Sequence, residues 1–304
     1  KETKMKQVLK MSAISTALLT LPMMANADVL ASVKPLGFIT SSIANGVTDT
    51  QILVPAGASP HDYSLKLSDV QKVKSADLVV WVGEDIDAFL AKPISQIDRK
   101  KVINISEIPE IKPLLSKVHH EHYHEGDEDE HGHDHKHGHD HKHEHGHDHE
   151  HHHHDVDENG LSVNWHLWYS PAISQIVAQK VADKLTEQHP DKKELIAKNL
   201  ADFNRTLTEQ SDKIKAQLAP LKDKGFFVFH DAYSYFNDAY GLNQTGYFTI
   251  NPLVAPGAKT IAHIKEEIEE HRVNCLFAEP QFTPKVIDTL AQSTKVNVGE
   301  GETA

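Results

Sequence analysis

Histidine is concentrated in one internal segment of the chain. From His119 to His154, 18 of the 24 histidines fall within 36 residues, and most alternate with Asp, Glu, Lys or Gly. Imidazole is a borderline ligand that suits zinc, copper, nickel and iron, and interleaved carboxylates suit zinc and harder cations. The segment therefore indicates a protein that handles a transition metal. A charged linker and an expression tag are the alternatives, but the internal position and the repeated HGHDHK unit argue against a tag.

The same segment carries most of the negative charge of the chain. It contains 11 acidic residues and two lysines, so it supplies −9 of the formal net charge of −13. We expect residues 119–154 to be solvated and disordered, because Tyr123 is the one apolar side chain that they offer for a core. The remaining body is only mildly acidic, which disfavours nucleic acid as a partner, since a phosphate-binding surface needs a basic patch. A cation is consistent with this charge balance as the ligand.

Three of the six other histidines lie where α/β sheets bind ligands. His61 lies in the turn-rich loop after a predicted strand at 51–54, and His230 directly follows a predicted strand at 225–229. His166 precedes a predicted helix. Ligands of open α/β sheets bind beyond the carboxyl ends of the strands. Three neutral imidazoles, with water or a carboxylate in fourth position, form a tetrahedral zinc set. We therefore predict that His61, His166 and His230 are the metal ligands.

The last three histidines have no predicted role in metal binding. His189 lies in a turn before Pro190, and His263 and His271 lie off the apolar stripe of their predicted helix. Each is expected to be an exposed surface residue.

Two series of alternating strands and helices position these residues. The first has strands at 28–33, 51–54, 77–82 and 101–105. Its helices lie at 38–46, at 69 to about 74 after an N-cap at Ser68, and from 87 onward. The second has strands at 225–229, 244–250, 274–278 and 295–298, with helices at 232–240, 258–272 and 284–291. This alternation predicts βαβ units and doubly wound parallel sheets.

A helical region without an accompanying strand separates the two series. It comprises a helix at 171–188, with Pro171 in its first turn, and a long polar helix at about 191–218. We therefore predict an α/β protein of two lobes joined by a connecting helix, with the ligand held in a cleft between them. The predicted divisions are an N-terminal lobe at 28–190 that includes the His-rich loop, a connecting helix at 191–220, and a C-terminal lobe at 221–304.

Residues 1–27 have the features of a signal peptide. Four lysines precede a mostly apolar run at 11–24, and Ala25-Asn26-Ala27 is an A-x-A cleavage site. Cleavage would place the mature protein outside the cytoplasm, and an uncleaved anchor is the alternative. Cys275, the single cysteine, cannot form an intramolecular disulfide.

Four motifs resemble one family of binding proteins. They are GASPHDYSLKLSDVQKVKSADLVVWVGEDIDAFL, HLWYSP, FFVFHDAYSYFNDAYGL and CLFAEPQF. The chain from about 28 to 298 resembles the zinc-uptake substrate-binding proteins of bacterial ABC transporters, the ZnuA type of the cluster A-I metal-binding family. The resemblance implies two Rossmann-like lobes with parallel sheets joined by a long backbone helix, and Zn²⁺ held between them as the transported ligand. The family's zinc histidines fall on His61, His166 and His230.

Two departures from the family pattern affect these expectations. Pro60 stands where some relatives have a Glu ligand, so the fourth position is left to water or a carboxylate, with Asp231 and Glu279 as adjacent candidates. The chain also leaves the pattern after Gly299, where the family continues into a final helix with a cysteine that would pair with Cys275. The resemblance therefore implies a truncated C-terminal lobe of reduced stability.

The resulting hypothesis is a periplasmic, monomeric zinc-binding protein that delivers Zn²⁺ to an ABC transporter permease and is not an enzyme. Its affinity is expected to fall as the histidines titrate near pH 6–7, and selectivity between zinc and manganese stays open. A zinc-dependent hydrolase is one alternative, because three histidines and a water also form a catalytic set. A metal-storage surface protein that uses only the His-rich segment is the other.

Overall fold

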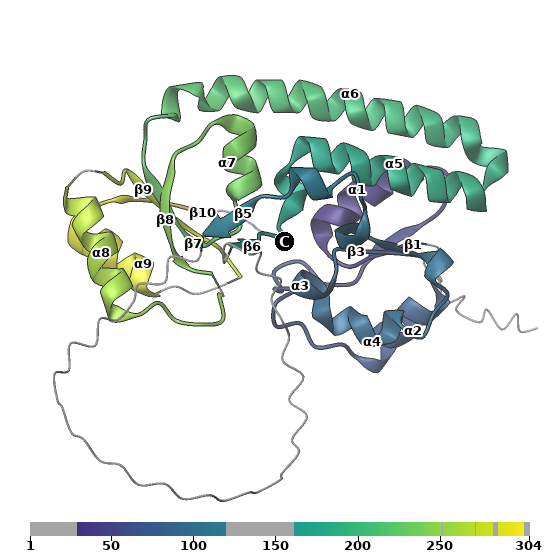
Figure 1. The fold of residues 1–304 in the computed structure, drawn as a ribbon, viewed down its shortest axis with the longest axis horizontal. Helices are drawn as coiled ribbons and strands as arrows, with labels where there is room; N and C mark the ends of the chain where they lie inside the picture. Colours follow the sequence, from purple (N-terminus) through teal and green to yellow (C-terminus); the bar gives the residue numbers. More distant parts are fainter. Residues whose placement is uncertain (1–28, 120–160, 251, 271, 282–284, 301–304) are drawn as a thin grey trace, which may run out of the picture.

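The computed structural model describes residues 29–119, 161–250, 252–270, 272–281 and 285–300. The predicted signal peptide lies outside these residues, as does the His-rich segment apart from its first residue, His119. The described residues form two α/β lobes, and the long helix α6 (Lys193–Leu218) runs along the top of both in Figure 1. Among the helices in this part of the chain, none has the length and apolar character needed to cross a membrane.

The first lobe is built on a four-stranded parallel sheet of order β2-β1-β3-β4. Its strands are β1 (Val29–Ala31), β2 (Thr50–Ile52), β3 (Leu78–Trp81) and β4 (Val102–Asn104). The two central strands are apolar throughout and fully buried, as expected for a parallel sheet covered on both faces. Successive residues of β1 and β3 therefore belong to different cores, one beneath each face.

Helices cover both faces of this sheet. One core includes α1 (Lys34–Ala44) and α5 (Pro171–Gln188), and the other includes α2 (Leu67–Ser75) and the residues that lead into α4 (Ala91–Ile94). A four-residue helix, α3 (Glu84–Asp87), follows β3.

The helix starts that differ from the prediction include those of α1 and α2. Helix α1 begins at Lys34 rather than 38, because Pro35 fits the first helical turn. Helix α2 begins at Leu67, so the predicted N-cap at Ser68 is wrong. The Asp69 carboxylate accepts a hydrogen bond from the backbone N–H of Lys66 and so caps the N-terminus of α2.

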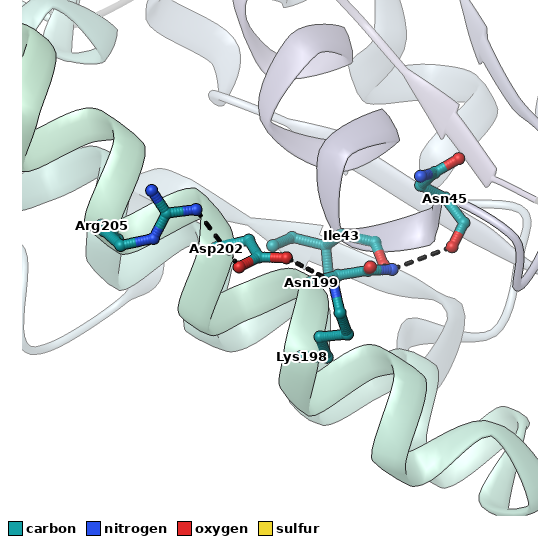
Figure 2. A network of polar contacts seen from close by, with 6 residues as sticks. All are labelled: Ile43, Asn45, Lys198, Asn199, Asp202 and Arg205. Atoms are coloured by element: carbon teal, nitrogen blue, oxygen red, sulfur yellow. Dashed lines mark hydrogen bonds and ion pairs between the residues drawn. The ribbon is translucent and has the colours of Figure 1, made fainter.

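Helix α6 is the connecting element that the sequence predicted. Its 26 residues span about 39 Å at 1.5 Å per residue, and they contact α1 and α5 in the first lobe and α7 (Ser234–Tyr240) in the second. Figure 2 shows how α6 is fixed to α1: the buried Asn199 side chain donates hydrogen bonds to the carbonyls of Ile43 and Asn45, each 2.9 Å long.

The second lobe repeats the plan with a parallel sheet of order β10-β9-β7-β8. Its strands are β7 (Phe226–His230), β8 (Gln244–Thr249), β9 (Cys275–Ala278) and β10 (Asn297–Glu300). Helices α8 (Ala258–Glu269) and α9 (Lys285–Thr294) pack on one face. The last strand begins two residues later than predicted, because α9 continues to Thr294 and Lys295 then turns with a positive φ of 57°. The reduced stability expected of this lobe stays a prediction.

A short antiparallel ribbon was not predicted. Strands β5 (Lys117–His119) and β6 (Leu161–Val163) pair with His119 opposite Leu161. The ribbon brings His119 and Leu161 side by side, directly before the loop that carries His166.

Candidate metal centre

The structure brings the three predicted histidines together where the two lobes meet. His61 lies in the loop between β2 and α2, His166 immediately precedes a short 3-10 helix, Leu167–Tyr169, and His230 is the last residue of β7. One ligand nitrogen from each histidine lies within 4.8 Å of the other two. The Nε2 atoms of His61 and His166 are 3.3 Å apart. Three segments that are distant in sequence thus converge on one point.

Burial keeps the three imidazoles neutral, which is the form that binds a metal. His230 and His166 are only 1% and 7% exposed, whereas His61 is half-buried. Loss of hydration lowers the pKa of both His61 and His230 to about 4 and lowers the pKa of His166 well below its ordinary value. His230 lowers the pKa of His61 and His166 further, because two adjacent imidazolium ions would repel each other. The site therefore carries unprotonated donors at neutral pH.

Asn164 orients His166, a role that the sequence analysis missed. Its side-chain Oδ1 is 2.8 Å from the Nδ1 of His166 and accepts the backbone N–H of the same histidine at 3.0 Å. An Asn that accepts the N–H two residues further on is a common local pattern, so the N-x-H spacing was a usable signal. The contact leaves Nε2 of His166 facing the other histidines.

Glu279 lies behind His230. Its Oε1 accepts the backbone N–H of His230 at 3.3 Å, and its Oε2 is 3.6 Å from Nδ1 of that ring. The carboxyl is almost completely buried, and burial raises the pKa of Glu279 to about 8. A carboxylate on the far nitrogen of a ligand histidine is a common arrangement around bound metals.

The two carboxylates considered for the fourth ligand position are engaged elsewhere. Glu279 contacts the back of His230, and Oδ1 of Asp231 accepts a hydrogen bond of 3.1 Å from the Gln244 side chain. Neither belongs to the metal-ligand cluster found among the described residues. Pro60, directly before His61, is buried.

Exposure was predicted wrongly for two of the other histidines. His189, which follows the end of α5, and His263 on α8 are both partly buried. Neither belongs to a metal-ligand cluster in the described part of the chain. His271 lies outside the described residues.

Comparison with known proteins places this geometry in a family. The family model for the periplasmic component A of zinc-uptake complexes, ZnuA, matches residues 29–303. The high-affinity zinc uptake system protein ZnuA of Haemophilus influenzae is 79% identical over 305 residues, which cover 97% of this chain and 90% of that protein. Its counterpart in Haemophilus ducreyi is 54% identical over 291 residues, covering 96% of this chain and 89% of that protein.

A solved structure agrees with the fold. The crystal structure of a ZnuA superposes with a TM-score of 0.69 at 19% identity and covers 90% of both chains. The family consists of substrate-binding proteins of zinc uptake systems rather than enzymes. Since the family model spans almost the whole described chain and the identity to curated relatives is high, this protein belongs to the ZnuA family of periplasmic zinc-uptake components.

Proposed function

We propose that this protein captures Zn²⁺ in the periplasm with His61, His166 and His230 and delivers it to the membrane permease of an ABC transporter. The observation that carries the proposal is the convergence of three unprotonated imidazoles, drawn from both lobes, on one point. Family membership supports zinc as the cargo, because the relatives are named for high-affinity zinc uptake. The A-x-A motif that ends at Ala27 supports export by a signal peptide.

The donor set favours zinc over manganese and calcium. Three nitrogen donors suit the tetrahedral coordination of Zn²⁺, whereas Ca²⁺ and Mn²⁺ prefer six or more oxygen ligands. The fourth position would be filled by water or by a carboxylate that moves on binding, entering beside the half-buried His61.

The rest of the chain would support capture in two ways. Helix α6 contacts both lobes and would restrict their opening, so that binding mainly orders the loops around the site. The His-rich segment 119–154 would bind further zinc ions weakly and raise the local supply.

Zinc titration by calorimetry tests the proposal. The mature chain from Asp28 is compared with His230→Ala, with a deletion of residues 120–153, and with the control His263→Ala, which removes a histidine outside the cluster. We expect one tight site that is lost only in His230→Ala and several weak sites that are lost only in the deletion. A tight site that disappears with the deletion, or that survives His230→Ala, would refute the assignment.

A further inference from the structure

We propose that Asn164 is the positioning residue that fixes the tautomer of His166 and so presents its Nε2 to the metal. The inference rests on the proposed function, because it concerns how one ligand of the zinc site is prepared. Asn164 directly follows β6 and is 4% exposed, so water cannot replace what its side chain provides.

Two contacts determine the tautomer. Oδ1 of Asn164 accepts the backbone N–H of His166 at 3.0 Å, so this side-chain atom must be the amide oxygen. The same oxygen is 2.8 Å from Nδ1 of the His166 ring. An amide oxygen can only accept, so Nδ1 carries the ring proton and Nε2 keeps its lone pair. Nε2 is the atom that lies 3.3 Å from Nε2 of His61, within the cluster.

The second lobe holds the amide of Asn164 in this orientation. Nδ2 of Asn164 donates a hydrogen bond of 3.0 Å to the carbonyl oxygen of Asp231, the residue after His230. A carbonyl oxygen accepts only, so reversal of the amide would place two oxygens against each other. The backbone carbonyl of Asn164 accepts the hydroxyl of Tyr235 on α7 at 2.5 Å, and that hydroxyl accepts the backbone N–H of Ser116 at 3.0 Å. Asn164 is thus fixed from three directions.

A purely structural role would look different, and the chain contains an example. Asn199 is also buried, at 8% exposure, and its Nδ2 donates to the backbone carbonyls of Ile43 and Asn45 at the end of α1 (Figure 2). Its hydrogen bonds fix α6 to the end of α1 and involve none of the three histidines. Replacement of Asn199 is therefore the matched control for the loss of a buried asparagine.

The experiment compares Asn164→Leu, Asn164→Asp and Asn199→Leu in the full mature chain. The Asp side chain keeps an oxygen that can accept from Nδ1 of His166 but loses the donor to Asp231, whereas Leu removes both. We expect Asn164→Leu to lower zinc affinity about 10- to 100-fold, the usual effect of removing a partner that orients a metal ligand. Asn164→Asp should retain the affinity while lowering the thermal midpoint, and Asn199→Leu should lower only the thermal midpoint.

A spectroscopic measurement reads the tautomer without any metal. In protein labelled with ¹⁵N-histidine, the His166 signals are assigned by their loss in His166→Gln. The wild type and Asn164→Asp should show a protonated Nδ1 and an unprotonated Nε2, and Asn164→Leu should show a mixture. Unchanged His166 signals in Asn164→Leu, or equal losses of affinity in the Leu and Asp variants, would overturn the proposal.

Failure of the proposed function would be recognised separately. Absence of a tight site in the wild type, or its survival in His230→Ala, refutes zinc capture by the three histidines. The ¹⁵N signals would still decide whether Asn164 sets the tautomer of His166.

Discussion

The structure predicts that the tight site keeps its zinc affinity in mildly acidic solution. A proton competes with the metal only when the pH approaches the pKa of the ligand imidazole. Burial lowers the pKa of His61 and His230 to about 4 and that of His166 well below its ordinary value. Because each pKa is lowered, protons compete with zinc for these nitrogens only in a more acidic range than they do for ordinary histidines.

The size of the effect follows from the fraction of imidazole that is protonated. At pH 5, a ligand with an ordinary pKa of about 6.5 is roughly 97% protonated, so three such ligands would together weaken binding roughly 3 × 10⁴-fold. With a pKa of about 4, His61 and His230 are each only about one-tenth protonated at pH 5, and the combined loss stays below about twofold. Ordinary pKa values, on which the expectation from the sequence rests, would instead make the zinc affinity fall near pH 6–7.

Competition with a chelator of known pH dependence measures the affinity from pH 7.5 to 5. The measurement uses the chain without residues 120–153, because zinc bound by their many histidines would mask the tight site. Glu279 lies beside His230, and its pKa is raised to about 8. Glu279→Gln is therefore measured in parallel, so that titration of this carboxyl does not contribute to the pH dependence. A tenfold or greater loss between pH 7 and 6 in both proteins would refute the argument from burial.

Three further predictions concern stability. The folded pKa of Glu279 is raised to about 8 from an ordinary value of 4.5, so its burial costs stability increasingly as the pH rises between these values. Glu279→Gln should therefore gain more in thermal midpoint over the wild type at pH 8 than at pH 5; an equal gain at both would contradict the shift. Ile264 is fully buried in the second lobe. Ile264→Ala should lower the free energy of unfolding by about 2–5 kcal/mol in denaturant titration. A loss below about 1 kcal/mol would indicate a poorly packed core. A Cβ at Gly225 would clash with the backbone carbonyl oxygen of Arg272. Gly225→Ala should therefore melt at a clearly lower temperature than the control Gly257→Ala, whose Cβ meets no atom within 4 Å.

The elements that the sequence predicted well have strong local signals. Strand β3 is a continuous apolar run, which is typical of a strand covered on both faces. Helix α5 begins at Pro171 as predicted, because Ser170 caps it and accepts the backbone N–H of Ile173 at 3.2 Å. Helix α7 ends at Tyr240 and is followed by Gly241, as predicted, whose φ of 69° suits a residue without a side chain.

The ribbon β5–β6 could not be predicted from local signals. Each strand has three residues, and the partners His119 and Leu161 are separated by the intervening residues 120–160. Pairing over such a separation depends on the surrounding fold, which here packs the following loop against Tyr235 of the second lobe. No pattern in either strand indicates the other.

The metal site shows the same division between local and distant information. His61 and His230 were predicted as ligands because each follows a strand, at the carboxyl end where open α/β sheets bind ligands. The residues that prepare the rings are of two kinds. Asn164 is two residues from His166 and contacts it through a local turn, whereas Glu279 reaches His230 from another strand, 49 residues further along the chain.

The clustering of these three histidines could therefore be predicted from the sequence, but their protonation state could not. An imidazole at His61, His166 or His230 could be charged or neutral, and only its burial and its neighbours decide which. Three exposed histidines at the same separation would repel one another when protonated and would lose the metal in mild acid. The fold thus contributes more than the position of three nitrogens: it removes water from around them and directs the proton of His166 away from the metal.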